Sequence, residues 1–339
     1  MTFLLAAMEN SVLVLESSKS GWKTTETLKG NHPQAVAFDQ GFSERLYCGT
    51  FDKGLMKSDN RGKCWDRIGE IAISSSIMSV SVGQKGKNEF SKLYAGTEPT
   101  ALYVSNDGGY SWEKMSGLND LESSDSWSFP PRPWTNHVRW IEIDANNPNY
   151  IFVAIEAGAL VQSQDDGKNW TDRVNGGPYD THTLRTHLKA PRRLYVAAGD
   201  GYFESFDYGK SWTSPRKGLE HHYLVGLALD PANPLSVVVS ASPSAMQAHA
   251  RGGEANSVIY GKSMGSEKWE KISKGLPESK GTIITMLSSN PFRAGEFYGI
   301  NNRGIFWSND SGTSWASLDI QWPKEYLLQH PFGIVVGED

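Results

Sequence analysis

A short motif recurs along the chain and constrains the fold more than any other feature. It reads Ser-x-Asp-x-Gly-x-(Ser/Thr/Asn)-Trp, and its four full copies end at Trp112, Trp170, Trp212 and Trp315. A fifth copy ends at Trp65 and carries Asn60 in place of the aspartate, and two degenerate copies end at Trp22 and Trp269. The seven tryptophans are 43, 47, 58, 42, 57 and 46 residues apart.

The length of this repeat predicts the architecture. Units of about 48 residues with four short strands each are typical of β-propeller blades, and the 339-residue chain accommodates seven of them. In the fifth unit, runs rich in β-branched and aromatic residues are bounded by Gly, Asp, Asn or Pro. From the innermost to the outermost strand, these runs cover residues 182–188, 193–197, 202–205 and 210–213.

The two ends of the chain supply parts of one blade. Residues 3–8, 12–16 and 21–25 predict its second to fourth strands, and residues 331–336 predict its innermost strand. Their pairing closes the ring and leaves no free sheet edge at that point. We therefore predict one all-β domain over residues 1–339, a seven-bladed β-propeller of four-stranded antiparallel blades.

The repeated motif resembles the Asp-box (BNR) repeat, and the resemblance covers the whole chain. Proteins with this repeat include sialidases, xyloglucan-degrading glycosidases, sortilin-type receptors and photosystem II assembly factors, so the resemblance implies the fold without choosing between enzyme and binding scaffold. The Arg-Ile-Pro segment of sialidases is absent. The motif aspartates are expected to stabilise turns on the outer rim, because they are spread around the ring and cannot converge on one substrate.

Composition excludes several classes of partner. The net charge is −5 and no Lys/Arg run occurs, which argues against nucleic acid and anionic membranes. The apolar runs are strand-sized, and no secretory signal is recognised, so we expect a cytoplasmic protein. The two cysteines, Cys48 and Cys64, form neither a disulfide framework nor a metal knuckle.

Five of the eight histidines fall where an innermost strand is predicted to begin: His32, His137, His182, His222 and His330. Strand starts gather at one mouth of the propeller channel. Neutral imidazole is a common ligand of Zn, Mn, Fe and Cu, so we expect these residues to bind a divalent transition metal, with His137, His182 and His222 foremost. Alternatively, the imidazoles form a general acid/base cluster, or they satisfy backbone groups or line a wet channel. The sequence leaves open whether His221 or His222 faces inward.

Loops between the second and third strands bring acidic residues to the same mouth. Glu98 and Glu156 occupy equivalent positions and are candidate catalytic carboxylates. Arg139 and Arg185 follow the strand-start histidines of two blades and are candidates for holding a substrate carboxylate or phosphate. The alternatives are solvated hairpin tips for the acids, and pairing of the arginines with acids such as Glu142.

Two long insertions also fall on this face. Residues 113–136 contain an aromatic, proline-rich segment at 127–134, and residues 241–257 carry His249 and Arg251. Long loops inside a compact domain are usually functional, so we expect both to cover a ligand.

These observations support three hypotheses. The first is a metal-dependent hydrolase or lyase acting on a small polar or anionic substrate. The second is a metal-free glycoside hydrolase that uses Glu98 and Glu156 on a saccharide. The third, implied by the resemblance to photosystem II assembly factors, is a non-catalytic scaffold that binds a protein partner.

Overall fold

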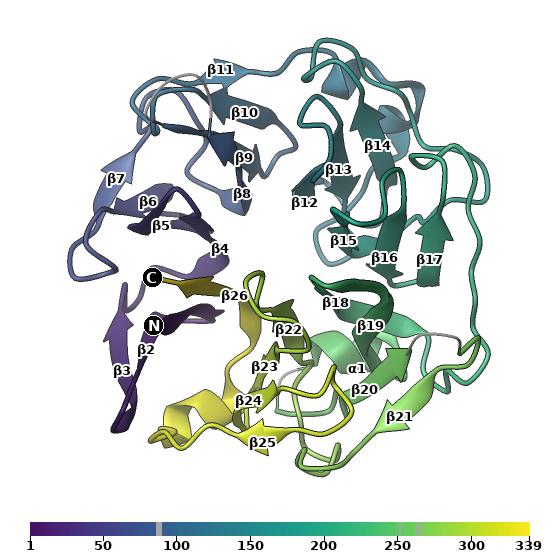
Figure 1. The fold of residues 1–339 in the computed structure, drawn as a ribbon. Coiled ribbons are helices and arrows are strands. Elements are labelled where there is room, and N and C mark those ends of the chain that lie inside the picture. Colours follow the sequence, from purple (N-terminus) through teal and green to yellow (C-terminus); the bar gives the residue numbers. More distant parts are fainter. Residues whose placement is uncertain (86–89, 251, 263–265) are drawn as a thin grey trace.

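Seven antiparallel sheets surround a central axis in the computed structural model (Figure 1), which describes residues 1–85, 90–250, 252–262 and 266–339. The predicted seven-bladed β-propeller is confirmed. Arg251, singled out in the second insertion, lies outside the described residues. No helix in the described part of the chain has the length and apolar character needed to cross a membrane.

The first three blades each have four strands, which follow one another from the axis outward. Blade one contains β26 (Pro331–Glu338), β1 (Thr2–Met8), β2 (Val12–Ser18) and β3 (Gly21–Thr27). Blade two contains β4 (Pro33–Asp39), β5 (Phe42–Thr50), β6 (Leu55–Ser58) and β7 (Asp66–Ile68). Blade three contains β8 (Ile77–Lys85), β9 (Ser91–Thr97), β10 (Leu102–Ser105) and β11 (Glu113–Lys114).

Blades four and five have three strands each, followed by an isolated bridge at the outer edge. Blade four contains β12 (Val138–Ile143), β13 (Ile151–Ile155) and β14 (Ala159–Ser163). Blade five contains β15 (Thr181–Arg185), β16 (Leu194–Ala198) and β17 (Gly201–Ser205). The strand expected at residues 210–213 is reduced to the bridge between Glu204 and Thr213. The residues before this bridge belong instead to the motif turn, where the N–H and hydroxyl of Ser211 bond the Asp207 carboxylate.

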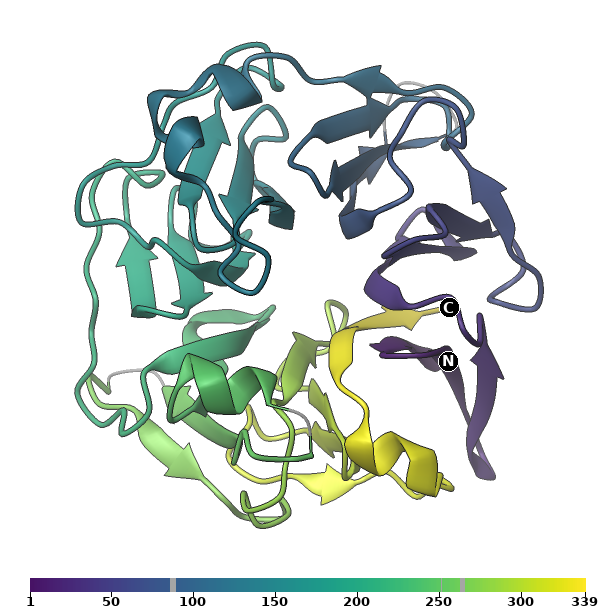
Figure 2. The ribbon, with the colours of Figure 1, turned by 180° about the vertical axis from the view of Figure 1, so that it is seen from behind.

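The last two blades again have four strands each. Blade six contains β18 (Tyr223–Asp230), β19 (Asn233–Ser242), β20 (Val258–Lys262) and β21 (Glu270–Ile272). Blade seven contains β22 (Met286–Ser289), β23 (Phe297–Asn301), β24 (Gly304–Ser308) and β25 (Ala316–Ser317). Four short helices lie in the connections: η1 (Leu118–Asp120), η2 (Glu122–Ser126), α1 (Ala245–His249) and η3 (Lys324–Leu328). In Figure 2 they lie on the near face.

The ring is closed in blade one, as predicted. Strand β26 pairs antiparallel with β1 from Thr2 opposite Glu338 to Met8 opposite Pro331, and the two chain ends lie side by side (Figure 1). All seven residues of β1 are buried, because this strand is covered by neighbouring blades on both sides. Its run of apolar residues therefore lacks the alternation of a half-exposed strand.

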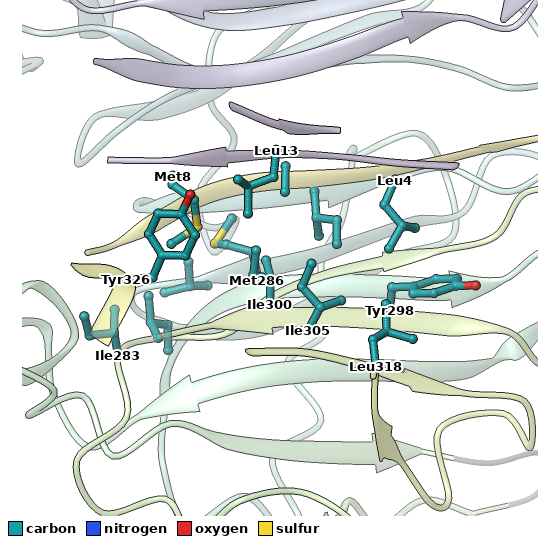
Figure 3. Close-up of a cluster of buried hydrophobic side chains, with 14 of the residues drawn as sticks. Leu4, Met8, Leu13, Ile283, Met286, Tyr298, Ile300, Ile305, Leu318 and Tyr326 are labelled. Atoms are coloured by element: carbon teal, nitrogen blue, oxygen red, sulfur yellow. The ribbon is translucent and has the colours of Figure 1, made fainter. Parts of the chain in front are cut away.

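The alternating side chains of β1 serve two different cores. Leu4 and Met8 pack with Ile300 and Ile305 of blade seven (Figure 3), whereas Phe3 belongs to the cluster shared with blade two. Packing between blades thus buries the apolar surface that a single four-stranded sheet would leave exposed.

The repeated motif forms the turn between the third and fourth strand positions of its blades. In blade three, Oδ1 of Asp107 accepts the Ser105 hydroxyl at 2.8 Å and the Ser111 N–H at 2.9 Å. Its second oxygen, Oδ2, accepts the Ser111 hydroxyl at 2.5 Å. The aspartate therefore stabilises a local turn on the rim.

The divergent copy in blade two carries Asn60 in place of the aspartate, and the contacts of Asn60 show how the turn is kept. Oδ1 of Asn60 accepts the Ser58 hydroxyl at 2.9 Å and the Cys64 N–H at 2.8 Å, reproducing two of the aspartate's three contacts. Cys64 stands where the other copies have a Ser or Asn donor for Oδ2. Where the donor for Oδ2 is missing, the single side-chain oxygen of an asparagine accepts the two remaining hydrogen bonds of the turn.

We predict that Asp207→Ala lowers the free energy of unfolding by up to about 1 kcal/mol at pH 7, because three hydrogen bonds of a turn are lost. Asp207→Asn keeps the two bonds to Oδ1 and should cost less. The Ser211 hydroxyl bond lowers the pKa of Asp207. Its carboxylate therefore stabilises the fold above the unfolded-state pKa of about 3.9, and this contribution disappears as the pH falls through the folded-state pKa. Denaturant unfolding at pH 7 and pH 3 should show a smaller Ala effect at pH 3; an equal effect would contradict this account.

The closing blade is also tied to blade two by a largely covered arginine, Arg61. The Arg61 side chain is 9% exposed, pairs with the carboxylate of Asp339 through both of its terminal nitrogens, and bonds the Ser43 hydroxyl at 3.0 Å. Its guanidinium also lies 4.7 Å from the centre of the Phe3 ring.

We predict that Arg61→Ala lowers the free energy of unfolding by about 1–3 kcal/mol, because it leaves polar partners unpaired at the closure. Arg67→Ala, which removes a surface ion pair with Glu70, should change it by less than about 1 kcal/mol. Denaturant melts of both variants check this, and equal losses would show that the Arg61 contacts add nothing beyond a surface pair.

Candidate functional site

The starts of the innermost strands lie on one face of the ring, which we call the mouth. His32, His137, His222 and His330 each directly precede an innermost strand, and His182 is the second residue of β15. The loops after β9 and β13 carry Glu98 and Glu156 to the same face. The structure places some of these residues in a central cluster and the others outside it.

Three of the predicted metal ligands lie apart from the central cluster. His32 is exposed and its Nδ1 lies 3.2 Å from Oδ1 of Asp52. His222 is exposed. His330 lies on the linker into β26, with Nε2 3.2 Å from the carbonyl oxygen of Ala250. His32 and His330 start strands of blades two and one, away from blades four to six. His222 belongs to blade six, but its neighbour Tyr223 is the residue whose side chain enters the cluster.

Glu98, His137 and Glu156 form a buried line of ionisable groups. Nε2 of His137 lies 2.8 Å from Oε2 of Glu156, and Nδ1 lies 3.5 Å from Oε2 of Glu98. The His137 side chain is 2% exposed and each carboxylate 9%. The imidazole therefore separates the two acids and links them electrostatically.

The two predicted arginines have different surroundings. Nε of Arg139 lies 3.4 Å from Oε2 of Glu156, which places this guanidinium in the cluster. Arg185 lies at the other end of its strand, 4.7 Å from the Trp140 ring and 3.5 Å from Oε2 of Glu142. Arg185 therefore pairs with Glu142, which is the predicted alternative to holding a substrate anion.

The electrostatics of Glu156 follow from these neighbours. Burial alone would raise the pKa of this carboxyl. The hydrogen bond and charge of His137, together with the charge of Arg139, outweigh burial and hold the pKa of Glu156 well below its usual range. Glu156 is therefore a carboxylate with a fixed orientation at neutral pH.

Sequence reasoning missed Tyr223, the first residue of β18. It considered His221 and His222, but the tyrosine hydroxyl reaches the cluster, 3.2 Å from Nε2 of His182 and 2.6 Å from Nε2 of His249. Burial raises the pKa of Tyr223, so the phenol stays protonated. His221, His222 and Tyr223 are consecutive, so the register of β18 decides which of their side chains points into the site. A shift of one residue exchanges inward and outward side chains.

His249 reaches the same point from the second insertion. It is the last residue of α1, whose N-cap Ser244 accepts the Gln247 N–H. The helix places the imidazole ring 6.4 Å from that of His182. The second insertion was expected to take part in the site, and His249 is the residue by which it reaches the cluster.

Asp180 completes the cluster and was also missed. Its Oδ1 accepts the Ala157 N–H at 2.9 Å, and its Oδ2 lies 3.6 Å from Nε2 of His182. Gly199 leaves the room for this carboxylate, because a Cβ there would lie 2.1 Å from Oδ2. An acid two residues before a strand-start histidine is the sequence signal that could have found it.

Glu156, His182 and His249 together can bind a metal ion. One ligand atom from each lies within 4.8 Å of the others. Nδ1 of His182 lies 2.6 Å from the Leu224 carbonyl oxygen, which can only accept, so Nδ1 carries the proton and Nε2 keeps its lone pair. A backbone carbonyl on the distal nitrogen is the usual arrangement of metal-binding histidines.

The fold and this cluster define a seven-bladed β-propeller with polar and ionisable groups gathered at one mouth. No family model matches the chain, and no curated protein matches it significantly. Among solved structures, similarity is found to the GH74 enzyme of Niastella koreensis, with a TM-score of 0.69 and 15% identity over 92% of this chain and 51% of that one. An ancestral GH74 enzyme gives a TM-score of 0.65 and 16% identity, over 84% of this chain and 38% of that one.

A propeller that binds a peptide is similar as well. YCF48 bound to D1 peptide gives a TM-score of 0.58 and 18% identity, over 84% of this chain and 80% of that one. The chain spans about half or less of the two GH74 enzymes. At these identities the likeness shows the fold alone.

We predict that Gly199→Ala displaces Asp180 and lowers the free energy of unfolding by about 1–3 kcal/mol, because the new methyl group overlaps the carboxylate. Gly261→Ala is the matched control, since its nearest neighbour would lie 3.4 Å away. Denaturant melts of both variants test this, and equal stability of the two would show that Asp180 moves aside without cost.

Proposed function

We propose that the mouth holds a divalent transition metal and that the protein is a metal-dependent hydrolase or lyase. The observation that carries the proposal is the convergence of Glu156, His182 and His249 from blades four, five and six. This ligand set replaces the predicted set of five strand-start histidines, of which it keeps only His182. Two imidazoles and a carboxylate suit Zn, Mn, Fe or Cu and leave coordination positions for water and substrate.

The surrounding residues fit such chemistry. A bound metal would polarise a substrate oxygen or lower the pKa of a bound water. Asp180, close to Nε2 of His182, is placed to accept a proton. Arg139 faces Glu156 through Nε, and no hydrogen bond links its terminal nitrogens to another described residue, so it can hold a substrate carboxylate or phosphate.

The contacts support the metal-free glycosidase less well. Arg132 binds both oxygens of Glu98, at 3.0 and 2.5 Å, and His137 lies between Glu98 and Glu156. Neither acid is therefore free to protonate a leaving group or attack a sugar without giving up a buried partner. The third hypothesis, a non-catalytic scaffold that binds a protein partner, is not supported by any contact described in the central cluster.

The test is elemental analysis of tag-free protein, after purification and after reloading with Zn²⁺, Mn²⁺, Fe²⁺ or Cu²⁺. We expect about one equivalent of one metal in the wild type. Both Glu156→Gln and His249→Ala should lose most of it, because each removes one of three ligands. His32→Ala and His222→Ala, which alter histidines outside the cluster, should keep it.

Turnover then separates enzyme from scaffold. Metal-loaded protein is compared with chelator-treated protein on nitrophenyl phosphates, esters and glycosides, and on carboxylate-bearing saccharides for elimination. Metal-dependent turnover that is lost in Arg139→Ala supports the proposal. If wild type and His249→Ala both hold no metal under every loading condition, the metal proposal is wrong and partner binding takes precedence.

A further inference from the structure

The first insertion sends an arginine down to the central cluster. Between β11 and β12, residues 128–135 form a tight loop in which the Phe129 N–H donates to the Thr135 carbonyl at 2.8 Å, and the Arg132 N–H donates to the Phe129 carbonyl at 2.8 Å. From this loop, Nε and Nη2 of Arg132 bind the two oxygens of Glu98 at 3.0 and 2.5 Å. A two-point contact fixes the plane of the carboxylate as well as its position.

Aromatic rings hold the arginine in place. Its guanidinium lies 4.8 Å from the centre of the Phe129 ring and 5.1 Å from that of Phe51 in the loop after β5. Phe129 in turn packs edge-to-face on His137, with ring centres 4.8 Å apart. The loop thus contacts the line of ionisable groups at two points, through Glu98 and through the imidazole.

The line ends at the proposed metal ligand. Glu98 Oε2 lies 3.5 Å from Nδ1 of His137, a buried atom with no hydrogen-bond partner among the described residues. On the other side of the ring, Nε2 lies 2.8 Å from Oε2 of Glu156. Arg139 also faces Oε2, whereas Oε1 of Glu156 accepts no hydrogen bond from a described residue.

We infer that the first insertion positions Glu156 for metal binding, through Arg132, Glu98 and His137 in that order. Arg132 is then a positioning residue: it orients Glu98, Glu98 orients the imidazole, and the imidazole holds one oxygen of Glu156 so that the other faces the metal. This inference rests on the proposed function. It adds that a loop from another part of the chain sets the affinity of the site, as groups behind metal ligands commonly do.

The experiment measures the affinity for Zn²⁺ by competition with a chromophoric chelator, and the visible absorption spectrum of the Co²⁺-loaded protein. We expect Arg132→Ala to weaken Zn²⁺ binding about 10–100-fold and to change the Co²⁺ spectrum. Arg132→Lys should recover part of the affinity, because it restores the charge but not the two-point contact. Trp134→Ala is the matched control in the same loop; its side chain is 80% exposed, and both readouts should be unchanged.

Glu98→Gln provides a second variant in case Arg132→Ala does not fold. It keeps the shape of the side chain, removes the charge that faces His137, and should weaken Zn²⁺ binding in the same direction. Wild-type affinity and spectrum in folded Arg132→Ala or Glu98→Gln would overturn the inference while leaving the metal site intact. A wild type that binds neither Zn²⁺ nor Co²⁺ and also holds no Mn²⁺, Fe²⁺ or Cu²⁺ after reloading would instead overturn the proposed function itself.

Discussion

The antiparallel pairing of β26 with β1 is the interaction on which the rest of the structure depends. It joins the two ends of the chain in one blade, and a ring held in this way keeps all seven innermost strands pointing in the same sense. Their first residues therefore meet at one face. The cluster around His137 and His182 forms there because residues 45 positions apart become neighbours when successive blades of the ring stand side by side.

The fold could be predicted from the sequence because the repeat carries its own structural reason. Each motif serine, aspartate and glycine makes a turn that the chain needs, as the contacts of Asp107 show, and seven tryptophans at nearly regular spacing count the blades. Closure was predictable for a similar reason: the first and last strand-sized runs together make one blade. The outer strand of blade five was not predictable, because residues before Thr213 that were expected in the strand belong to the motif turn around Asp207.

The site could be predicted only in part. Counting from the tryptophans places His137 and His182 at strand starts, and equivalent loops place Glu156 beside them. The count cannot tell which of three consecutive residues at the start of β18 points inward, and Tyr223 does so. The position of the His249 side chain depends on the conformation of the second insertion, and the position of Arg132 depends on that of the first. Neither insertion repeats, so no internal copy of the sequence reveals its path.

The donors Glu156, His182 and His249 belong to three successive blades, and no single loop holds two of them. Their spacing is therefore set by how blades four, five and six pack against one another, over apolar contacts such as those that join Phe152 to Leu184 and Leu194. A substitution deep in such an interface, distant from every polar group at the mouth, would tilt one blade. The distances between the side chains of Glu156, His182 and His249 would then change. For the proposed metal site, the preference between ions of different radius would then depend on the apolar packing between these blades.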